Sequence, residues 1–470
     1  MDGKDSSSRR GFLLAAAGAP AVLRAAPGSD ARPNIVFLLT DDQRHDTLGA
    51  MGNSIVKTPN LDDLAARGVV FDNSFVTTSI CMSSRASILT GLYTRCHGIN
   101  DFATPLAPQA FDNSYPALLR AAGYRTGFIG KYGVGNHMPA DRFDYWKGFP
   151  GQGQFFPPEG GGEHLTNIQG QQAVEFIEGA KPGRPFCLSV SFKAPHAQDP
   201  DPEQYLYDPA LESLYRDVEI PLPKTAAPHY FDRLPDFMKN TEGRNRWKWR
   251  FDTPEKYQRM VKAYYRLITG VDVVVGRIRQ ALADAGCERN TIIIFASDNG
   301  YFLAERGMAD KWLAYEESIR TPLIVYDPRR PGRGRRRSEM ALNIDLAPTM
   351  LDFAGVRVPP SVQGRSLRPL LGAGKPPWRR EFFYEHHFEY QGKIPHSEAV
   401  RTENWKYIRY VAPTPGREEF YDLRRDPLEE HDLAAGAQSR ERLDALRGRW
   451  RAWSEALARW QPGAPWKDPA

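Results

Sequence analysis

Runs of apolar residues alternate along this chain with segments of helical period. The clearest apolar run covers 34–39 and ends in Thr40, and others cover 126–129, 186–192, 291–296 and 323–326. Runs of this kind are typical of strands buried on both faces of a sheet. Helical patterns lie between them, at 61–67 and from Thr253 to Leu282, with Pro254 in the first helical position of the second. The pattern predicts an α/β fold with a large, mostly parallel sheet covered by helices on both faces.

The pattern changes near residue 370. Residues 372–377 are rich in glycine and proline, as in a linker or surface turn. Beyond them, short strand-like segments precede an amphipathic helix that carries leucine and tryptophan over 443–457; these segments are 382–385, 399–402, 405–411 and 419–423. We predict a main domain over 31–370 and a small C-terminal domain over 371–470, in which an antiparallel sheet packs against a helix. The arginine-rich run 329–337 is predicted to be a solvated loop.

The first 30 residues have the pattern of an export signal. Arg9 and Arg10 precede an apolar stretch over 12–23, and the small residues Ala25 and Ala26 follow it. This order matches a twin-arginine signal, whereas the alternative is a disordered basic tail. We predict that 1–30 directs a bacterial protein through the twin-arginine export machinery to the periplasm or beyond. No other segment has the length and apolarity of a membrane span.

Composition narrows the class of protein. The chain has 470 residues, a net charge of +5 and 41% hydrophobic residues, which is typical of a globular protein. The charge is too mild to argue for a nucleic-acid partner. The four cysteines, Cys81, Cys96, Cys187 and Cys287, are too few for a disulfide scaffold and lack zinc-like spacing.

Acidic side chains follow two of the predicted strands. Asp41 and Asp42 come directly after the first, and Asp298 and Asn299 come after the run at 291–296. One such pair is commonly a turn or a helix cap, but two pairs at one sheet edge suit a hard divalent cation such as Ca²⁺ or Mg²⁺. Lys131 and His196 also lie just past predicted strands, at the edge where α/β sheets form their sites.

Cys81 lies in the sequence Ser-Ile-Cys-Met-Ser-Ser-Arg-Ala-Ser-Ile-Leu-Thr-Gly, residues 79–91. The spacing predicts that Cys81 starts a helix and that Arg85 lies one turn further on the same face. A helix N-terminus and a guanidinium would both favour an anion there. The alternative is that Cys81 is a small buried hydrophobe.

These motifs resemble those of the type I sulfatases, which have an alkaline-phosphatase-like fold. The resemblance extends over nearly the whole mature chain, including the Gly130-Lys131 and Lys193-Ala194-Pro195-His196 motifs. It implies that Cys81 is oxidised to formylglycine, the nucleophile, by a formylglycine-generating maturation enzyme. It further implies Arg85, Lys131, His196 and Lys311 as catalytic residues, and one divalent cation, Ca²⁺ in preference to Mg²⁺, on Asp41, Asp42, Cys81, Asp298 and Asn299.

The implied activity is hydrolysis of sulfate monoesters, with sulfated sugars or glycans as the expected substrates. The metal and the two lysines would neutralise the sulfate oxygens, and His196 would protonate the departing alcohol. The chain loosely resembles the N-acetylglucosamine-6-sulfatase-like branch. Two alternatives remain: a phosphodiesterase or phosphonate monoester hydrolase of the same fold, and an exported glycan-binding protein with unmodified Cys81.

The chain departs from the family pattern at two positions. Ser83 stands two residues after Cys81, where relatives carry proline or alanine, and Gly133 stands where many relatives carry histidine. His137 is a hypothetical replacement for that histidine. Further candidates for substrate contact are Arg246 and Trp247, in a basic and aromatic cluster, and His387 in the small domain.

Overall fold

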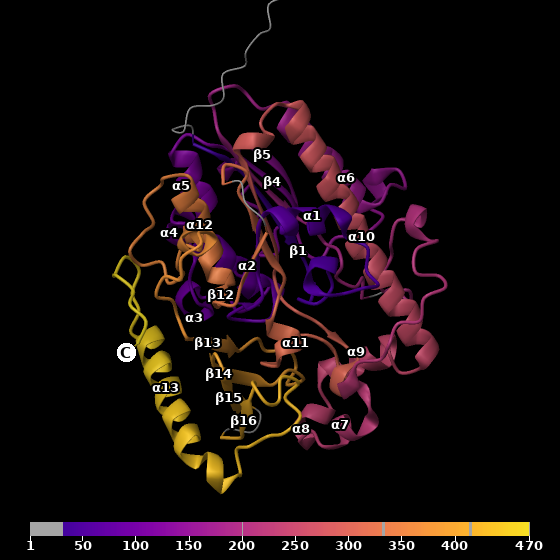
Figure 1. Cartoon of the computed structure of the whole chain (residues 1–470), viewed down its shortest axis with the longest axis vertical. Helices are drawn as coiled ribbons and strands as arrows, with labels where there is room; N and C mark the ends of the chain where they lie inside the picture. Colours follow the sequence, from indigo (N-terminus) through magenta and orange to yellow (C-terminus); the bar gives the residue numbers. More distant parts are fainter. Residues whose placement is uncertain (1–31, 200, 331–333, 413–415, 470) are drawn as a thin grey trace, which may run out of the picture. The chain divides into compact units, whose positions relative to one another are not determined.

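The computed structural model (Figure 1) describes residues 32–199, 201–330, 334–412 and 416–469. The segment Arg32–Ala470 forms one compact unit. The predicted export signal, residues 1–30, lies outside the described residues. A second, smaller sheet begins at Glu381, and the division into two domains near residue 370 stays a prediction.

An eight-stranded sheet forms the centre of this unit. Its strand order is β11-β2-β10-β7-β1-β6-β4-β5. Pairings are parallel except those of β10, which runs antiparallel to β2 and β7. The strands are β1 (Asn34–Thr40), β2 (Val69–Phe71), β4 (Arg125–Lys131), β5 (Tyr145–Phe149), β6 (Phe186–Ser191), β7 (Thr291–Ser297), β10 (Leu323–Tyr326) and β11 (Arg335–Arg337). The predicted mostly parallel sheet is confirmed, with all five apolar runs as strands.

Helices cover both faces of this sheet. Val36 and Leu38 of β1 belong to a core cluster with α6 (Leu165–Glu178) and α10 (Pro254–Asp284). The alternate side chains of the same strand belong to a second cluster on the other face, with α2 (Cys81–Thr90), α5 (Tyr115–Ala121) and α12 (Leu346–Phe353). Figure 1 shows these two sets of helices on opposite sides of β1 and β4. Burial on both faces explains why β1 is apolar at nearly every position.

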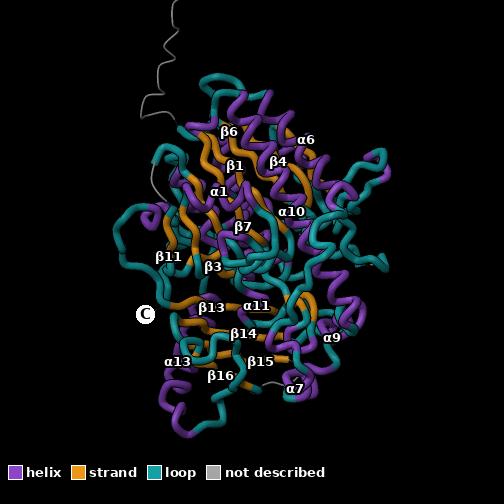
Figure 2. Tube along the Cα trace, turned by 45° about the vertical axis from the view of Figure 1, so that its right-hand side comes forward, coloured by secondary structure: helices purple, strands orange, loops and turns teal. Residues whose placement is uncertain are grey.

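A four-stranded antiparallel sheet follows in the last hundred residues, as predicted. It consists of β13 (Glu381–His386), β14 (His396–Thr402), β15 (Trp405–Ala412) and β16 (Glu418–Asp422). One face packs against α13 (Arg440–Ala458), where the rings of Phe383 and Trp453 stack. On the other face, the Tyr384 hydroxyl donates to the Trp312 carbonyl at 3.0 Å. The small sheet therefore lies between α13 and the loops that follow the main sheet (Figure 2).

The prediction of a solvated loop over 329–337 was wrong for its last three residues. Arg335–Arg337 forms β11, an edge strand that pairs parallel with β2. Arg337 is buried, and its Nε donates to the Leu370 carbonyl at 2.6 Å. Backbone carbonyls accept the hydrogen bonds of the guanidinium, so a charged residue is tolerated in this edge strand. The sequence did not predict the strand because it lacks an alternating apolar and polar pattern.

The remaining helices and strands are short, and among the described residues no helix is long and apolar enough to cross a membrane. These elements are α1 (Pro59–Arg67), β3 (Ser74–Phe75), α3 (Thr94–His97), α4 (Pro108–Asp112), α7 (Pro228–Asp232), α8 (Asp236–Lys239), α9 (Glu242–Arg250), β8 (Phe302–Leu303), β9 (Ala309–Asp310), α11 (Glu316–Ile319) and β12 (Ala341–Leu342).

Candidate functional site

Chemically active side chains gather where the central strands end. Asp41 follows β1, Asp298 follows β7, and Lys131 is the last residue of β4. These strands and β6 are parallel neighbours, so their carboxyl ends meet at one edge of the sheet. His196 lies in the loop after β6 at the same edge. The topology of the sheet therefore brings these side chains together, as the sequence predicted.

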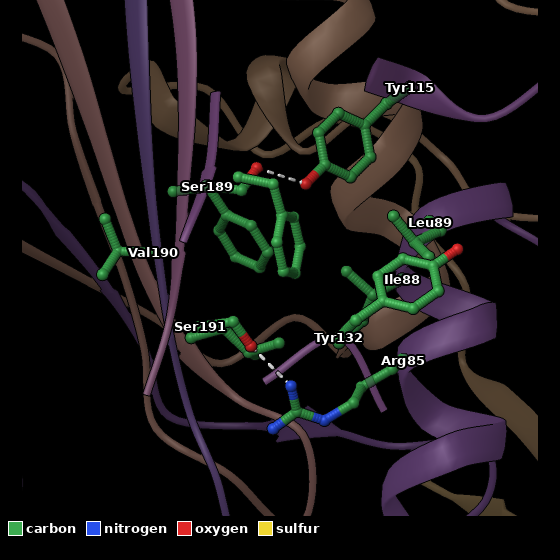
Figure 3. A pocket seen from close by; sticks show the side chains of 11 residues that line it. Arg85, Ile88, Leu89, Tyr115, Tyr132, Ser189, Val190 and Ser191 are labelled. Carbon is green, nitrogen blue, oxygen red and sulfur yellow. Dashed lines mark hydrogen bonds between the residues drawn. The ribbon is translucent and has the colours of Figure 1, made fainter. Parts of the chain in front are cut away.

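Cys81 is the first residue of α2, as the spacing predicted. Arg85 lies one turn on, and its Nε donates to Asp298 Oδ2 at 2.8 Å while its Nη1 donates to the Lys131 carbonyl at 2.7 Å. Figure 3 shows the same guanidinium reaching Ser191 of β6. Arg85 thus connects the nucleophile helix to the ends of β4, β6 and β7.

A small, mainly apolar pocket lies behind this arginine. Its walls include side chains of β1 and β6 and the aromatic rings of Tyr115 and Tyr132 (Figure 3). The Tyr115 and Ser189 hydroxyls satisfy each other across it at 2.6 Å. Arg85 thus has apolar and aromatic side chains on one side and the Asp41 and Asp298 carboxylates on the other, and burial leaves this charge interaction less screened than in water.

Two lysines bind the paired aspartates. Lys131 Nζ donates to Asp41 Oδ2, and to Gln152 Oε1 at 2.6 Å. Lys311 Nζ donates to Asp42 Oδ1. All of these lysine and aspartate side chains are buried. The structure therefore brings the two predicted lysines, which are far apart in the sequence, to the same acidic pair.

His196 completes this group. Its Nδ1 donates to the Ala197 carbonyl at 2.5 Å, so the proton on Nδ1 is fixed and Nε2 is left 3.5 Å from Asp42 Oδ2. Burial, and then Lys311, hold the pKa of His196 well below its usual value. The imidazole is consequently neutral, and an anion bound beside it would raise its pKa toward that of a proton donor.

The carboxylates are strongly perturbed. Burial raises the pKa of Asp42 to about 7 against the opposing effect of Lys311. Burial and the charge of Asp41 raise the pKa of Asp298 to about 6, against the effect of Arg85. Burial also acts to raise the pKa of Asp41, but Lys131, His196 and Arg85 outweigh it and hold that pKa well below its usual value. Three buried carboxylates in contact with the same cations repel one another, and this repulsion adds to burial in raising the pKa values of Asp42 and Asp298.

The free acceptor atoms of these residues fit a hard cation. Among the described residues, Asp41 Oδ1, Asp42 Oδ2 and Asn299 Oδ1 are buried and have no hydrogen-bond partner. Asp41, Asp42 and His196 also offer ligand atoms within 4.8 Å of one another. Carboxylate and amide oxygens are the ligands that Ca²⁺ and Mg²⁺ prefer, and a buried oxygen without a partner is costly unless a ligand satisfies it.

Burial works against Cys81 as a nucleophile in its own right. It raises the pKa of the Cys81 thiol in spite of the opposing charges of Lys131 and Lys311. A thiol that stays protonated is a weak nucleophile. Position 81 therefore suits a nucleophile, but an unmodified thiol at this position would be a weak one.

The structure accounts for both departures from the family pattern. Gly133 has φ +70°, and a Cβ at this position would lie 2.8 Å from Arg85 Cδ, so a side chain there requires Arg85 to move. Ser83 is buried, and its Oγ donates to the Ile99 carbonyl at 2.7 Å. Serine at 83 therefore connects α2 to the segment after α3 by a hydrogen bond that proline or alanine would not make. His137 lies exposed in the loop after β4.

The predicted substrate residues are placed differently from the catalytic ones. Arg246 in α9 pairs with Glu242, Asp199 and Asp310, so its donors are already used within the protein. Trp247 is half-buried and packs against the main core. His387 pairs with Glu398 at 3.2 Å in a cluster with Glu385, whose charges Arg95 balances.

Three residues of the site were not identified from the sequence. Gln152 holds Lys131 from the loop after β5 and carries no motif. Asp310 precedes Lys311 and binds both Arg246 and Arg250, by 2.8 and 2.5 Å hydrogen bonds. Lys193 is buried, and burial together with Lys131 lowers its pKa to about 8. Only Asp310 and Lys193 had a sequence signal, because both lie inside motifs already singled out.

Comparison with known proteins places this site in a family. Residues 33–356 match the family model Sulfatase, and residues 304–455 match the model of the N-sulphoglucosamine sulphohydrolase C-terminal region. The chain is 30% identical over 479 residues to an N-acetylglucosamine-6-O-sulfatase of Bacteroides thetaiotaomicron, covering 87% of this chain and 83% of the relative. It is 30% identical to the human N-sulphoglucosamine sulphohydrolase, covering 93% and 92% of the two chains.

A solved structure gives the same result. The complex of a protein with its substrate D-glucosamine-2-N,6-O-disulfate superposes with a TM-score of 0.80 at 27% identity, covering 92% of this chain and 99% of the other. The match includes both the main and the small sheet, because it spans nearly the whole of each chain. The chain belongs to the sulfatase family, within the alkaline-phosphatase-like superfamily.

Proposed function

We propose that this protein hydrolyses sulfate monoesters on sulfated sugars, using a formylglycine made from Cys81 and a bound divalent cation. The observation that carries the proposal is the buried group at the ends of β1, β4 and β7, where Lys131, Lys311 and Arg85 surround the acidic pair. A sulfate monoester is a tetrahedral anion, and cations preorganised around it stabilise the charge that develops as it reacts.

Each side chain has a role that its contacts support. Lys131 and Lys311 would bind the non-bridging sulfate oxygens with the ammonium protons that their protein partners leave unused, since an ammonium has three donors. Arg85 would orient the group at position 81 from the next turn of α2. His196 would donate a proton from Nε2 to the departing sugar oxygen, with its Nδ1 held by the Ala197 carbonyl.

Two groups must be added to this chain for the reaction. Formylglycine at position 81 would supply a hydrated aldehyde, which offers one hydroxyl to attack sulfur and a second by which sulfate is later released. The cation would be held by Asp41, Asp42, Asp298, Asn299 and the group at position 81, and would act as a Lewis acid. The donor set favours Ca²⁺ over Mg²⁺, because Ca²⁺ takes many oxygen ligands from the protein, whereas Mg²⁺ is usually held by only one or two carboxylates and keeps several waters.

The similarity to an N-acetylglucosamine-6-O-sulfatase and to a solved complex with a disulfated glucosamine supports glucosamine-type sugars as the substrate class. One relative is named for N-acetylglucosamine 6-sulfate, and the solved complex holds a disulfated glucosamine. We further propose export from the cytoplasm, supported by the twin-arginine pattern in residues 1–30. A maturation enzyme that makes formylglycine would then be a required partner.

Initial rates on a panel of substrates test this proposal. We expect the fastest turnover with a sulfated monosaccharide, slower turnover with 4-nitrophenyl sulfate, and little with a bis-aryl phosphodiester or an aryl phosphonate. Faster turnover of the phosphodiester or phosphonate than of every sulfate ester would assign the protein to that other class. An unmodified Cys81 in protein from the native host, together with no turnover of any ester, would favour the glycan-binding alternative.

Asp310→Asn is expected to lower kcat by about 10- to 100-fold through misplacement of Lys311. Asp310 Oδ1 lies 3.7 Å from Lys311 Nζ, and its Oδ2 accepts from Arg246 and Arg250. Removing this charge leaves Arg246 and Arg250 to share Asp199, and it takes away the carboxylate nearest to both guanidinium groups and to Lys311. Steady-state kinetics with a sulfated monosaccharide measure the effect. The matched control is Glu242→Gln, which also contacts Arg246 and should stay within about twofold; an unchanged kcat for Asp310→Asn would refute the positioning role.

A further inference from the structure

Asp42 has a left-handed backbone conformation, with φ +64°. This region is uncommon for residues other than glycine, although less so for aspartate, and it persists at functional sites where neighbouring groups hold it. Asp42 Oδ1 accepts from Lys311 Nζ and from Asn299 Nδ2. Its Oδ2 lies 3.5 Å from His196 Nε2 and has no hydrogen-bond partner among the described residues. The backbone at Asp42 therefore sets the direction of two oxygens on which the site depends.

The turn at Asp42 is held on one side by the end of β7. The Asp42 N–H donates to Asp298 Oδ1 at 3.1 Å. The next N–H, that of Gln43, donates to Ser297 Oγ at 2.9 Å. These bonds leave two backbone groups of the turn to be satisfied, the Asp42 carbonyl and the N–H of Arg44, two residues later. Both residues are buried, so both groups need a partner.

Tyr264 of α10 is the partner of both groups. Its hydroxyl donates to the Asp42 carbonyl at 2.7 Å and accepts from the Arg44 N–H at 3.2 Å. Among the described residues, no other hydrogen bond reaches either backbone group. A hydroxyl can make this bridge because it is a donor and an acceptor at once. Tyr264 therefore closes the turn from the helix layer, outside the main sheet.

The ring of Tyr264 is fixed by packing that does not involve its hydroxyl. The side chain is fully buried, stacks on Tyr301 with the ring centroids 5.7 Å apart, and meets the ring of Tyr205 edge-on at 5.8 Å. The hydroxyls of Tyr205 and Tyr301 bond each other at 2.7 Å. A phenylalanine at position 264 would keep the ring contacts and lose only the bridge between the two backbone groups. The contribution of the hydroxyl can therefore be separated from that of the ring.

We propose that Tyr264 is a positioning residue, which holds Asp42 in its left-handed conformation and so forms the cation site before the cation binds. This inference rests on the proposed function, which requires the divalent cation. Without the hydroxyl, the turn would relax and rotate the Asp42 carboxylate away from the other ligands. Binding of the cation would then have to restore the left-handed conformation, and the affinity would fall.

The contacts of Tyr264 also indicate how a loss should be reversed. The hydroxyl bonds only the backbone of the turn, so its effect on Lys311 passes through the Asp42 carboxylate. A cation that occupies the site draws this carboxylate back to the other ligands. High concentrations of the cation should therefore restore turnover when the hydroxyl is missing, as they would not for a residue that takes part in the reaction.

The test compares Tyr264→Phe with the wild-type enzyme in titrations with Ca²⁺, after dialysis against a chelator. We expect the Kd for Ca²⁺, measured by calorimetry, to rise about 10- to 100-fold, as is usual when a group that orients a metal ligand is removed. The Ca²⁺ concentration for half-maximal turnover of the sulfated monosaccharide should rise by the same factor. At saturating Ca²⁺, kcat should stay within about threefold of wild type.

Tyr215→Phe is the matched control. Tyr215 is another buried tyrosine of the same core cluster, and its hydroxyl also bonds a backbone group and a side chain of the fold. It accepts from the Lys57 N–H at 2.8 Å and bonds Thr269 Oγ1 of α10 at 2.6 Å. Removal of this hydroxyl should lower the melting temperature, as in Tyr264→Phe, but leave the Kd for Ca²⁺ within about twofold of wild type.

Other outcomes would overturn the assignment. If wild type binds Ca²⁺ and Tyr264→Phe binds it equally well, the positioning role is wrong and the proposed function stands. A fall in kcat that saturating Ca²⁺ does not restore would place the effect of Tyr264 outside the cation site. If neither protein binds Ca²⁺, both this inference and the cation site fail, and the substrate panel alone decides the function.

Hydrogen exchange of residues 41–44 in chelated wild type provides a second measurement should Tyr264→Phe not fold. We expect slow exchange without Ca²⁺, because the hydrogen bonds of the turn are already formed. Fast exchange that Ca²⁺ makes slow would show that the cation forms the turn, and would refute the role of Tyr264.

Discussion

Cys81→Ala is expected to lower kcat/KM for a sulfate ester by about 10⁴-fold or more, the largest effect of any single substitution in this chain. The substitution removes the group that would become formylglycine, while Arg85, the lysines and His196 remain. Binding of substrate should survive, because those cations bind the sulfate oxygens. Steady-state kinetics, with calorimetric binding of the unreacted ester, would separate the two effects.

Cys81→Ser provides a sharper test than alanine. A serine at the start of α2 has one hydroxyl, so it could take the sulfuryl group and release the alcohol once. It has no second hydroxyl with which to expel sulfate, and water would have to attack the sulfur to free it. In protein shown to keep the serine, we expect at most one equivalent of alcohol per enzyme. Continued turnover of that protein would show that the formylglycine mechanism is wrong.

The state of residue 81 must be measured alongside the kinetics. Mass spectrometry of the peptide that contains residue 81 reports whether the thiol sulfur has been replaced by an aldehyde oxygen. Ser83 makes this measurement necessary. Its side chain is buried and donates to the Ile99 carbonyl in the folded protein, so a maturation enzyme would have to recognise it in the unfolded chain. Cys96→Ala is the matched control, since Cys96 is a free, half-buried cysteine next to the small sheet and should keep full activity.

The sequence predicted the parts of the site that depend on strand ends. Asp41, Lys131 and Asp298 each end or follow a run that is apolar because both of its faces are buried, and parallel strands bring such ends together. Cys81 was predictable for a similar reason, since the spacing to Arg85 is that of one helical turn. These inferences required only local patterns and one rule of topology.

The contacts of long side chains were not predictable in this way. Arg246 lies in a basic and aromatic stretch of the kind that binds anions. In the structure, however, its guanidinium pairs with Asp199, Glu242 and Asp310, which come from three different segments. His386 and His387 are adjacent in sequence, and the imidazole of either could in principle act as an acid, a base or a metal ligand. Only the pairing of β13 with β14 assigns one to the face of Ser79 and the other to the pair with Glu398. The face of the small sheet that each histidine occupies therefore depends on tertiary structure.

Removal of divalent cations is expected to abolish turnover, by about 10³-fold or more, and to lower the melting temperature. Three carboxylates of the site are buried, and two have raised pKa values, near 7 for Asp42 and near 6 for Asp298. A cation bound to them relieves this repulsion only in the folded state, so it stabilises the fold by about 4 kcal/mol when its concentration is a thousand times its Kd. Dialysis against a chelator, followed by titration with Ca²⁺ or Mg²⁺, gives both readouts.

Asp298→Asn separates binding of the cation from general stability. This variant should lose turnover and should show no rise in melting temperature when Ca²⁺ is added. The matched control is Asp272→Asn in α10, another buried carboxylate whose pKa is raised by burial, but which accepts from the Leu61 and Asn60 backbone at the start of α1. That variant should melt lower than wild type and still gain stability from Ca²⁺. If wild type itself gains nothing from either cation, the oxygens of Asp41, Asp42 and Asn299 must be satisfied by water, and the cations that neutralise the sulfate would be the lysines and Arg85 alone.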